Sequence, residues 1–152
     1  MIASLEELAK TKGRILGVDF GDVRTGLALS DPSRFLSSGL ETISPGGLEK
    51  TAQAVAERAR REGAVAIVSG LPKNMDGSEG FRSDRCRQFA ERLSELVSPI
   101  PVVLFDERLT TVSASRFLNE TNTRGKARKE VVDTLSAEIL LQDLLNRLKN
   151  LS

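Results

Sequence analysis

The stretch ILGVDFGDVRTGLALSD, residues 15–31, decides how the fold of this chain is interpreted. It contains two β-rich runs, 14–20 and 24–30, separated by three residues, a spacing typical of a β-hairpin. Asp19 lies inside the first apolar run. Strand alternation predicts that it shares a face with Gly17, and we expect helices to cover that face of a central strand.

A charged carboxylate on a covered face is costly unless it is paired or coordinates a metal ion. Two interpretations of Asp19 follow. In the first, it ends the strand and accepts hydrogen bonds from turn amides near Gly21. In the second, it is a ligand in a functional site. The position of Asp19 alone does not separate these interpretations.

Beyond the hairpin, strands and helices alternate. The predicted elements are a weaker strand within 35–43, a helix at about 47–63, an apolar strand at 64–70, a helix at about 80–97, a strand at 101–105, and helices at about 111–119 and 128–149. In the helix at 80–97, Phe81 begins an apolar stripe that we expect to be packed. The pattern predicts an α/β fold in a single domain over 14–150: a mixed five-stranded sheet with helices on both faces. Residues 1–13 form a short extension, expected outside the core.

Composition excludes several kinds of site. The 152 residues include no histidine, so Ser-His and Cys-His nucleophile pairs and histidine zinc sites are excluded. A formal net charge of +1 gives no overall attraction for an anionic polymer, so nucleic acid would be held by local basic patches. The single cysteine, Cys86, excludes an internal disulfide. We expect a cytoplasmic protein, because no apolar run is long enough to span a membrane and the N-terminus is too polar for a signal peptide.

Two further acidic positions accompany Asp19. Asp106 and Glu107 follow the buried strand at 101–105 at its carboxyl end, where open α/β sheets build their sites, although a surface ion pair would also explain them. Asp133 heads a helical stripe that continues to Leu144, although an acid in the first turns of a helix also gains from the helix dipole. Carboxylates that converge without histidine predict a bound cation, and oxygen ligands of this kind suit Mg²⁺ or Mn²⁺.

Four ordered motifs carry a resemblance to a known family. They are GVDFGDVRTGLALSD, VSGLPKNMDGS, VVLFDERLTT and KEVVDTLSAEILLQ, within residues 14–148. Together they resemble the YqgF family, small RNase H-like proteins described as Holliday junction resolvases and as pre-16S rRNA nucleases. The resemblance implies an RNase H-like fold, metal-dependent nuclease activity and an acidic site at Asp19, Glu107 and Asp133. Asp106 is the alternative ligand, since adjacent residues on an extended segment point opposite ways.

Basic residues near these motifs are candidates for contact with the nucleic-acid backbone. Lys73, which follows a central strand, could hold a phosphate, although its loop also reads as a turn that needs Gly77. The other candidates are Arg24, Arg108, Arg124, Lys126 and Arg128, the last three in a basic loop before the final helix. Asp22, where the family commonly has Thr, adds a negative charge near the site.

The leading functional hypothesis is a nuclease that processes the ends of the 16S ribosomal RNA precursor. One alternative is resolution of branched DNA at Holliday junctions, which favours a dimer, whereas nothing in the sequence declares a dimer surface; we expect a monomer or weak dimer. A second is a nucleic-acid-binding module without catalysis. A third is an ATP-binding phosphotransferase, since a similar strand-turn-strand binds phosphate in actin-like folds, but such sites need two domains and this chain has room for one.

Overall fold

The computed structural model describes residues 2–74, 76–106 and 125–151, and the side chains of 125–133 lie outside that description. The described elements, in chain order, are α1 (Leu5–Ala9), β1 (Ile15–Asp19), β2 (Thr25–Ser30), β3 (Ser37–Ile43), α2 (Leu48–Arg61), β4 (Ala66–Leu71), α3 (Phe81–Val97), β5 (Val102–Asp106) and α5 (Gly125–Leu151). The five predicted strands are confirmed. The helix expected at 111–119 lies outside the described residues.

The described strands form a five-stranded sheet in the order β3-β2-β1-β4-β5. β1 pairs antiparallel with β2, as the hairpin spacing predicted, and β2 pairs antiparallel with β3. β1 and β4 are parallel, as are β4 and β5, so the carboxyl ends of these three strands meet at one edge of the sheet. We call this edge the carboxyl edge.

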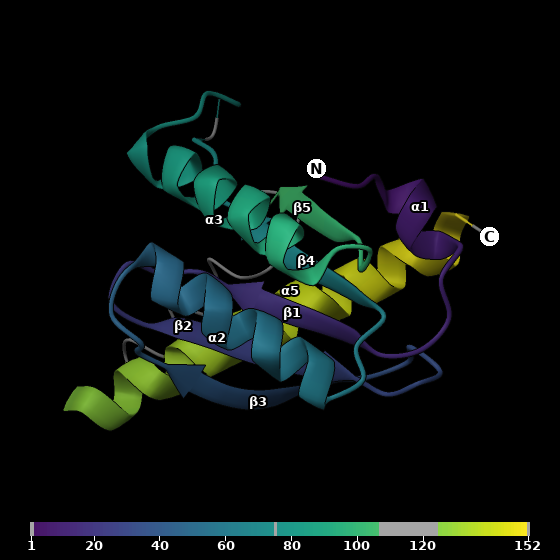
Figure 1. The fold of residues 1–152 in the computed structure, drawn as a ribbon, viewed down its shortest axis with the longest axis horizontal. Helices are drawn as coiled ribbons and strands as arrows, with labels where there is room; N and C mark the ends of the chain where they lie inside the picture. Colours follow the sequence, from purple (N-terminus) through teal and green to yellow (C-terminus); the bar gives the residue numbers. More distant parts are fainter. Residues whose placement is uncertain (1, 75, 107–124, 152) are drawn as a thin grey trace.

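Helices cover both faces of the sheet, as expected. Figure 1 shows α2 and α3 side by side on one face and the long α5 crossing the other. The core is divided accordingly: Leu16 and Val18 pack in the cluster with α2 and α3, whereas Ile15 packs in the cluster with α5. No helix among the described residues is both long enough and apolar enough to span a membrane.

Close contact between α5 and β1 depends on Gly17. A Cβ atom added at Gly17 would lie 2.9 Å from Cβ of Leu141 and 3.3 Å from the carbonyl oxygen of Ala137. Leu141 and Ala137 are fully buried on α5. The absence of a side chain at Gly17 therefore lets the helix lie directly on the strand that ends in Asp19.

The N-terminal extension corrects one expectation, because part of it belongs to the core. Leu8 is fully buried in the α5 cluster, and α1 lies beside the C-terminal end of α5 (Figure 1). Arg34 fixes the segment from the β2–β3 connection: its guanidinium donates hydrogen bonds to the carbonyl oxygens of Gly13 and Leu8 and to Oγ1 of Thr11. Burial lowers the pKa of Arg34 from its ordinary value. The sequence of residues 1–13 is mostly polar, and Leu8 is the residue of this segment that is fully buried.

Leu8 provides a test of this packing. We expect Leu8→Ala to lower the free energy of unfolding by about 3 kcal/mol, the usual cost of a cavity left by a buried leucine. Urea denaturation measures the change. Leu36→Ala is the matched control, because Leu36 is 68% exposed and its truncation leaves no cavity. Equal effects of the two substitutions would show that the extension does not contribute to the core.

Candidate active site

Asp19 is the last residue of β1 and is 7% exposed. Because β1 ends at this residue, Asp19 lies at the carboxyl edge, where it pairs in register with Gly26 of β2. Its alternation with Gly17 and Ile15 places it on the α5 face, as predicted. The buried carboxylate therefore lies on the face covered by α5, the helix that includes Asp133.

The turn after Asp19 is built around Gly21. A Cβ atom at Gly21 would lie 2.4 Å from the carbonyl oxygen of Arg24, so a side chain does not fit there. The hydroxyl of Thr25 closes the turn: it accepts a hydrogen bond from N–H of Gly21 and lies within hydrogen-bond distance of the Gly21 carbonyl oxygen. The turn thus has its own partner in Thr25. The turn therefore does not depend on Asp19 alone for its hydrogen bonds.

Asp106 ends β5 at the same edge but on the other face of the sheet. Phe105 packs in the α5 cluster, and Asp106 pairs in register with Leu71, which packs in the cluster with α2 and α3. Asp106 is therefore directed away from the face that holds Asp19. This arrangement favours Glu107, the next residue, as the ligand from the DER motif, although Glu107 lies outside the described residues. Its role stays a prediction.

Lys73 lies at the centre of a charged network at the carboxyl edge. Its Nζ atom is 4.0 Å from Oδ2 of Asp106 and 4.0 Å from Oε2 of Glu79. Arg87 of α3 holds Glu79 through two hydrogen bonds of 2.7 Å. The hydrogen bond from Arg87 is the main reason that the pKa of Glu79 lies below its ordinary value, and Lys73 adds to the effect. Two carboxylates thus hold the ammonium group at this edge.

Asp22 has a partner that lies far away in sequence. Its carboxylate accepts a hydrogen bond of 3.0 Å from Nε of Arg85 on α3. This ion pair joins the β1–β2 turn to α3, as does a stacked pair of rings, Phe20 and Phe89, whose centroids are 4.3 Å apart. Asp22 therefore has a local counter-charge. Its negative charge acts on the site less than the sequence suggested.

The N-terminal part of α5 is seated on β3 by two contacts of Thr134. Its Oγ1 atom lies 2.7 Å from Oγ1 of Thr42, and a Cβ atom at Gly39 would lie 2.4 Å from its Cγ2. Thr134 follows Asp133 directly, so the position of this backbone is determined by β3. The stripe that Asp133 heads, Ala137, Leu140 and Leu144, is fully buried as predicted.

The remaining predicted site residues are only partly described. Arg24 is half-buried at the end of the β1–β2 turn. Arg108 and Arg124, like Glu107, lie outside the described residues, and the side chains of Asp133, Lys126 and Arg128 do too. One expectation is wrong: the basic segment before the last helix is not all loop, because α5 begins at Gly125 and its first turns include Lys126 and Arg128. Among the side chains that the structure describes, those of 2–74, 76–106 and 134–151, no group of three metal-ligating residues is present.

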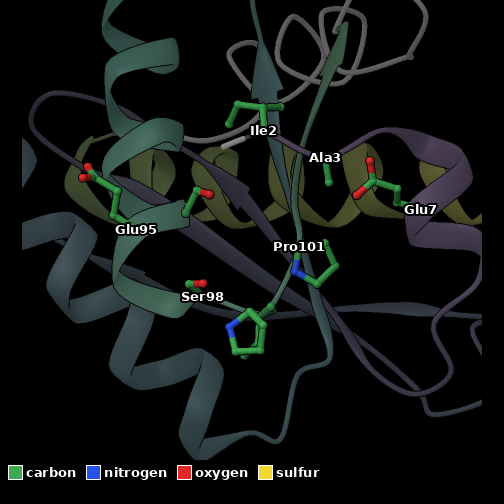
Figure 2. A pocket seen from close by; sticks show the side chains of 9 residues that line it. Ile2, Ala3, Glu7, Glu95, Ser98 and Pro101 are labelled. Atoms are coloured by element: carbon green, nitrogen blue, oxygen red, sulfur yellow. The ribbon is translucent and has the colours of Figure 1, made fainter.

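A hollow of about 530 Å³ lies elsewhere, between the N-terminal segment and the end of α3. Figure 2 shows Glu7 and Glu95 at its opposite sides and Ile2, Ala3, Ser98 and Pro101 between them. Because Pro101 precedes β5, this hollow is at the amino end of the parallel strands. It is remote from Asp19 and has no part in the site.

Comparison with known sequences identifies a family. The family model described as RuvX, Holliday junction resolvase, matches residues 13–147. A protein of Caldanaerobacter subterraneus named "Putative pre-16S rRNA nuclease" is 43% identical over 139 residues, which cover 90% of this chain and 99% of the relative. A protein of Ruminiclostridium cellulolyticum with the same name is 41% identical over 89% of this chain and 95% of the relative.

Comparison with solved structures identifies the fold. RuvC of Thermus thermophilus, solved in complex with a Holliday junction substrate, has a TM-score of 0.56 at 12% sequence identity, covering 90% of this chain and 96% of RuvC. The fowlpox virus Holliday junction resolvase has a TM-score of 0.52 at 13% identity, covering 90% and 99%. At these identities the likeness is one of fold, and it confirms the predicted RNase H-like architecture.

Proposed function

The chain belongs to the RuvX family, and from that premise we propose that it is a divalent-metal-dependent endonuclease that processes the ends of the 16S ribosomal RNA precursor. The names of its relatives support the substrate. The observation that carries the chemistry is Asp19, a carboxylate buried at the carboxyl edge on the face that α5 covers. A protein that acts on this RNA belongs in the cytoplasm.

The acidic donor set fits a hard divalent cation. Asp19, Glu107 and Asp133 would supply only carboxylate oxygens, which Mg²⁺ and Mn²⁺ accept, and the chain has no histidine to favour a softer metal. Asp106, beside Lys73 on the other face, is the poorer ligand. When bound, such ions supply the Lewis acidity that activates water and stabilises the charge developing in phosphodiester cleavage.

Lys73 would guide the sugar-phosphate backbone to this edge. Its ammonium is held by Asp106 and Glu79 but keeps 23% side-chain exposure, so it remains accessible to a phosphate oxygen. Arg24 and the basic residues around the start of α5 would extend the contact. Cleavage of the bond itself would depend on the acidic residues, whereas these cations would bind and orient the substrate.

Lys73→Gln tests the proposed contact between Lys73 and a phosphate group. We expect a higher KM with a smaller change in kcat, and a slope of log affinity against log salt that is reduced by about one, because one phosphate contact is lost. Lys10→Gln is the matched control, since Lys10 is exposed at the opposite edge of the sheet. A Lys73 variant with unchanged KM and salt slope would exclude the phosphate contact.

The substrate is tested by offering the wild-type protein three labelled nucleic acids: RNA that includes a 16S precursor end, a four-way DNA junction and an unbranched DNA duplex. Each is incubated with Mg²⁺, Mn²⁺ or EDTA. We expect cuts in the RNA with metal and none with EDTA. Paired, symmetric cuts confined to the junction, with a dimer by light scattering, would establish the resolvase instead. Binding with no metal-dependent cut of any substrate would establish a binding module.

A further inference from the structure

Phe81, the first residue of α3, does not pack as its sequence pattern predicts. It begins the apolar stripe of this helix, yet it is 73% exposed, whereas Phe89 and Leu93 on the same helix are fully buried. Val23, in the β1–β2 turn, is 71% exposed. Leaving a phenylalanine ring in water gives up the stabilisation that burial would provide. The exposed ring is therefore available for contact with a ligand.

Two interactions place Phe81 at the carboxyl edge. The hydroxyl of Ser83 donates a hydrogen bond to the carbonyl oxygen of Pro72, the residue that follows β4. The Arg85–Asp22 ion pair joins the next turn of α3 to the β1–β2 turn, which itself follows Asp19. The start of α3, where the ring stands, thus lies at the carboxyl edge of the sheet.

The surroundings of the ring suit an anionic, aromatic ligand. Arg82 is exposed and forms no ion pair with any residue in the described part of the chain, and it lines a small hollow with Asp22 and Arg85. A flat ring and an uncompensated guanidinium on successive residues match a nucleotide, which offers a base to the ring and a phosphate to the cation.

We propose that Phe81 stacks on an unpaired base of the substrate beside the cleavage site, with Arg82 on the adjoining phosphate. The proposal rests on the nuclease function above and narrows its substrate, because inside a duplex both faces of a base are already stacked. The preferred substrate is therefore a single strand, or a single-stranded end next to a duplex. Stacking of this kind does not distinguish RNA from DNA.

The absence of tryptophan and tyrosine from the chain permits a direct test. Phe81→Trp introduces a single fluorescent indole at the proposed contact. We expect its emission to be quenched by single-stranded RNA and by single-stranded DNA, in EDTA so that the strands stay intact, and not by a blunt duplex. Phe35→Trp is the matched control: Phe35 is 59% exposed, in the β2–β3 connection at the opposite edge. Its emission should not change.

Affinity supplies the second readout. Phe81→Ala should weaken binding of a single strand about 5- to 150-fold, the range for one stacked base, while Phe81→Trp retains wild-type affinity. Because the ring is exposed, both variants should keep the wild-type melting temperature. Wild-type affinity in Phe81→Ala, or equal quenching at positions 81 and 35, would overturn the proposal. Quenching at position 81 in a protein that cuts nothing would support stacking while refuting the nuclease.

Discussion

Asp19→Asn is expected to abolish nuclease activity. The substitution preserves the shape of the side chain but removes the charge that would hold a divalent cation. Bound metal contributes several kcal/mol to transition-state stabilisation, and each 1.4 kcal/mol is a factor of ten, so cleavage should fall about 1,000-fold or more. The measurement is single-turnover cleavage of the precursor RNA in Mg²⁺. Circular dichroism should show an unchanged fold, since Asn fits the same buried position.

Asp22→Asn is the matched control for this experiment. Asp22 is an aspartate three residues further along the same turn, with half of its side chain exposed and its carboxylate bound to Arg85. Its substitution should change cleavage less than about tenfold, because a surface ion pair contributes little. If the two variants lost activity equally, the effect would come from the net charge of the edge and not from a specific ligand at position 19.

Gly17→Val should produce a large loss of stability. Already the first atom of the new side chain would lie 2.9 Å from Cβ of Leu141, and the γ-methyl groups would extend further into α5. Overpacking of a tight interior costs about 1–3 kcal/mol, and we expect the upper end because the obstacle is a helix and not the tip of a flexible side chain. The melting temperature should fall by about 5–10 °C.

Gly80→Ala is the control for stability. A Cβ atom at Gly80 meets nothing within 4 Å, and its φ of −112° suits any residue. Its melting temperature should match the wild type within about a degree. Cleavage by Gly17→Val, measured well below its melting temperature, should also fall, because displacing α5 moves Asp133 relative to Asp19. A Gly17→Val protein of wild-type stability would contradict the close contact of strand and helix.

The strands were predictable because their apolar runs are continuous and their turns are short. Alternation within β1 was sufficient to place Asp19 on the same face as Gly17, the face that α5 covers. The errors concern burial decided by tertiary contacts. Leu8 is buried because α1 lies beside α5, and Phe81 is exposed although its spacing matches the stripe. Hydrophobic periodicity identifies the apolar face of a helix, but it does not show which of the residues on that face another element will cover.

The charged partners at the site could not be predicted in the same way. Arg85 and Asp22 are 63 residues apart, and their pairing depends on how α3 lies over the β1–β2 turn. Glu79 was missed because its sequence position is typical of a polar loop residue. In the structure it accepts a hydrogen bond from Arg87 and forms an ion pair with Lys73. The sequence around a charged loop residue does not indicate which distant residue of opposite charge it will contact. Only the folded sheet brings β4, β5 and α3 to one edge.

Direct measurement of metal binding tests the central claim, that Asp19 holds a divalent cation. Isothermal titration with Mn²⁺, without nucleic acid, should show binding to the wild type and to Asp22→Asn, and binding at least about tenfold weaker to Asp19→Asn. That result would place the metal at the buried carboxylate independently of any activity. Equal affinity of the wild type and Asp19→Asn, or no binding to the wild type, would show that Asp19 does not hold a divalent cation.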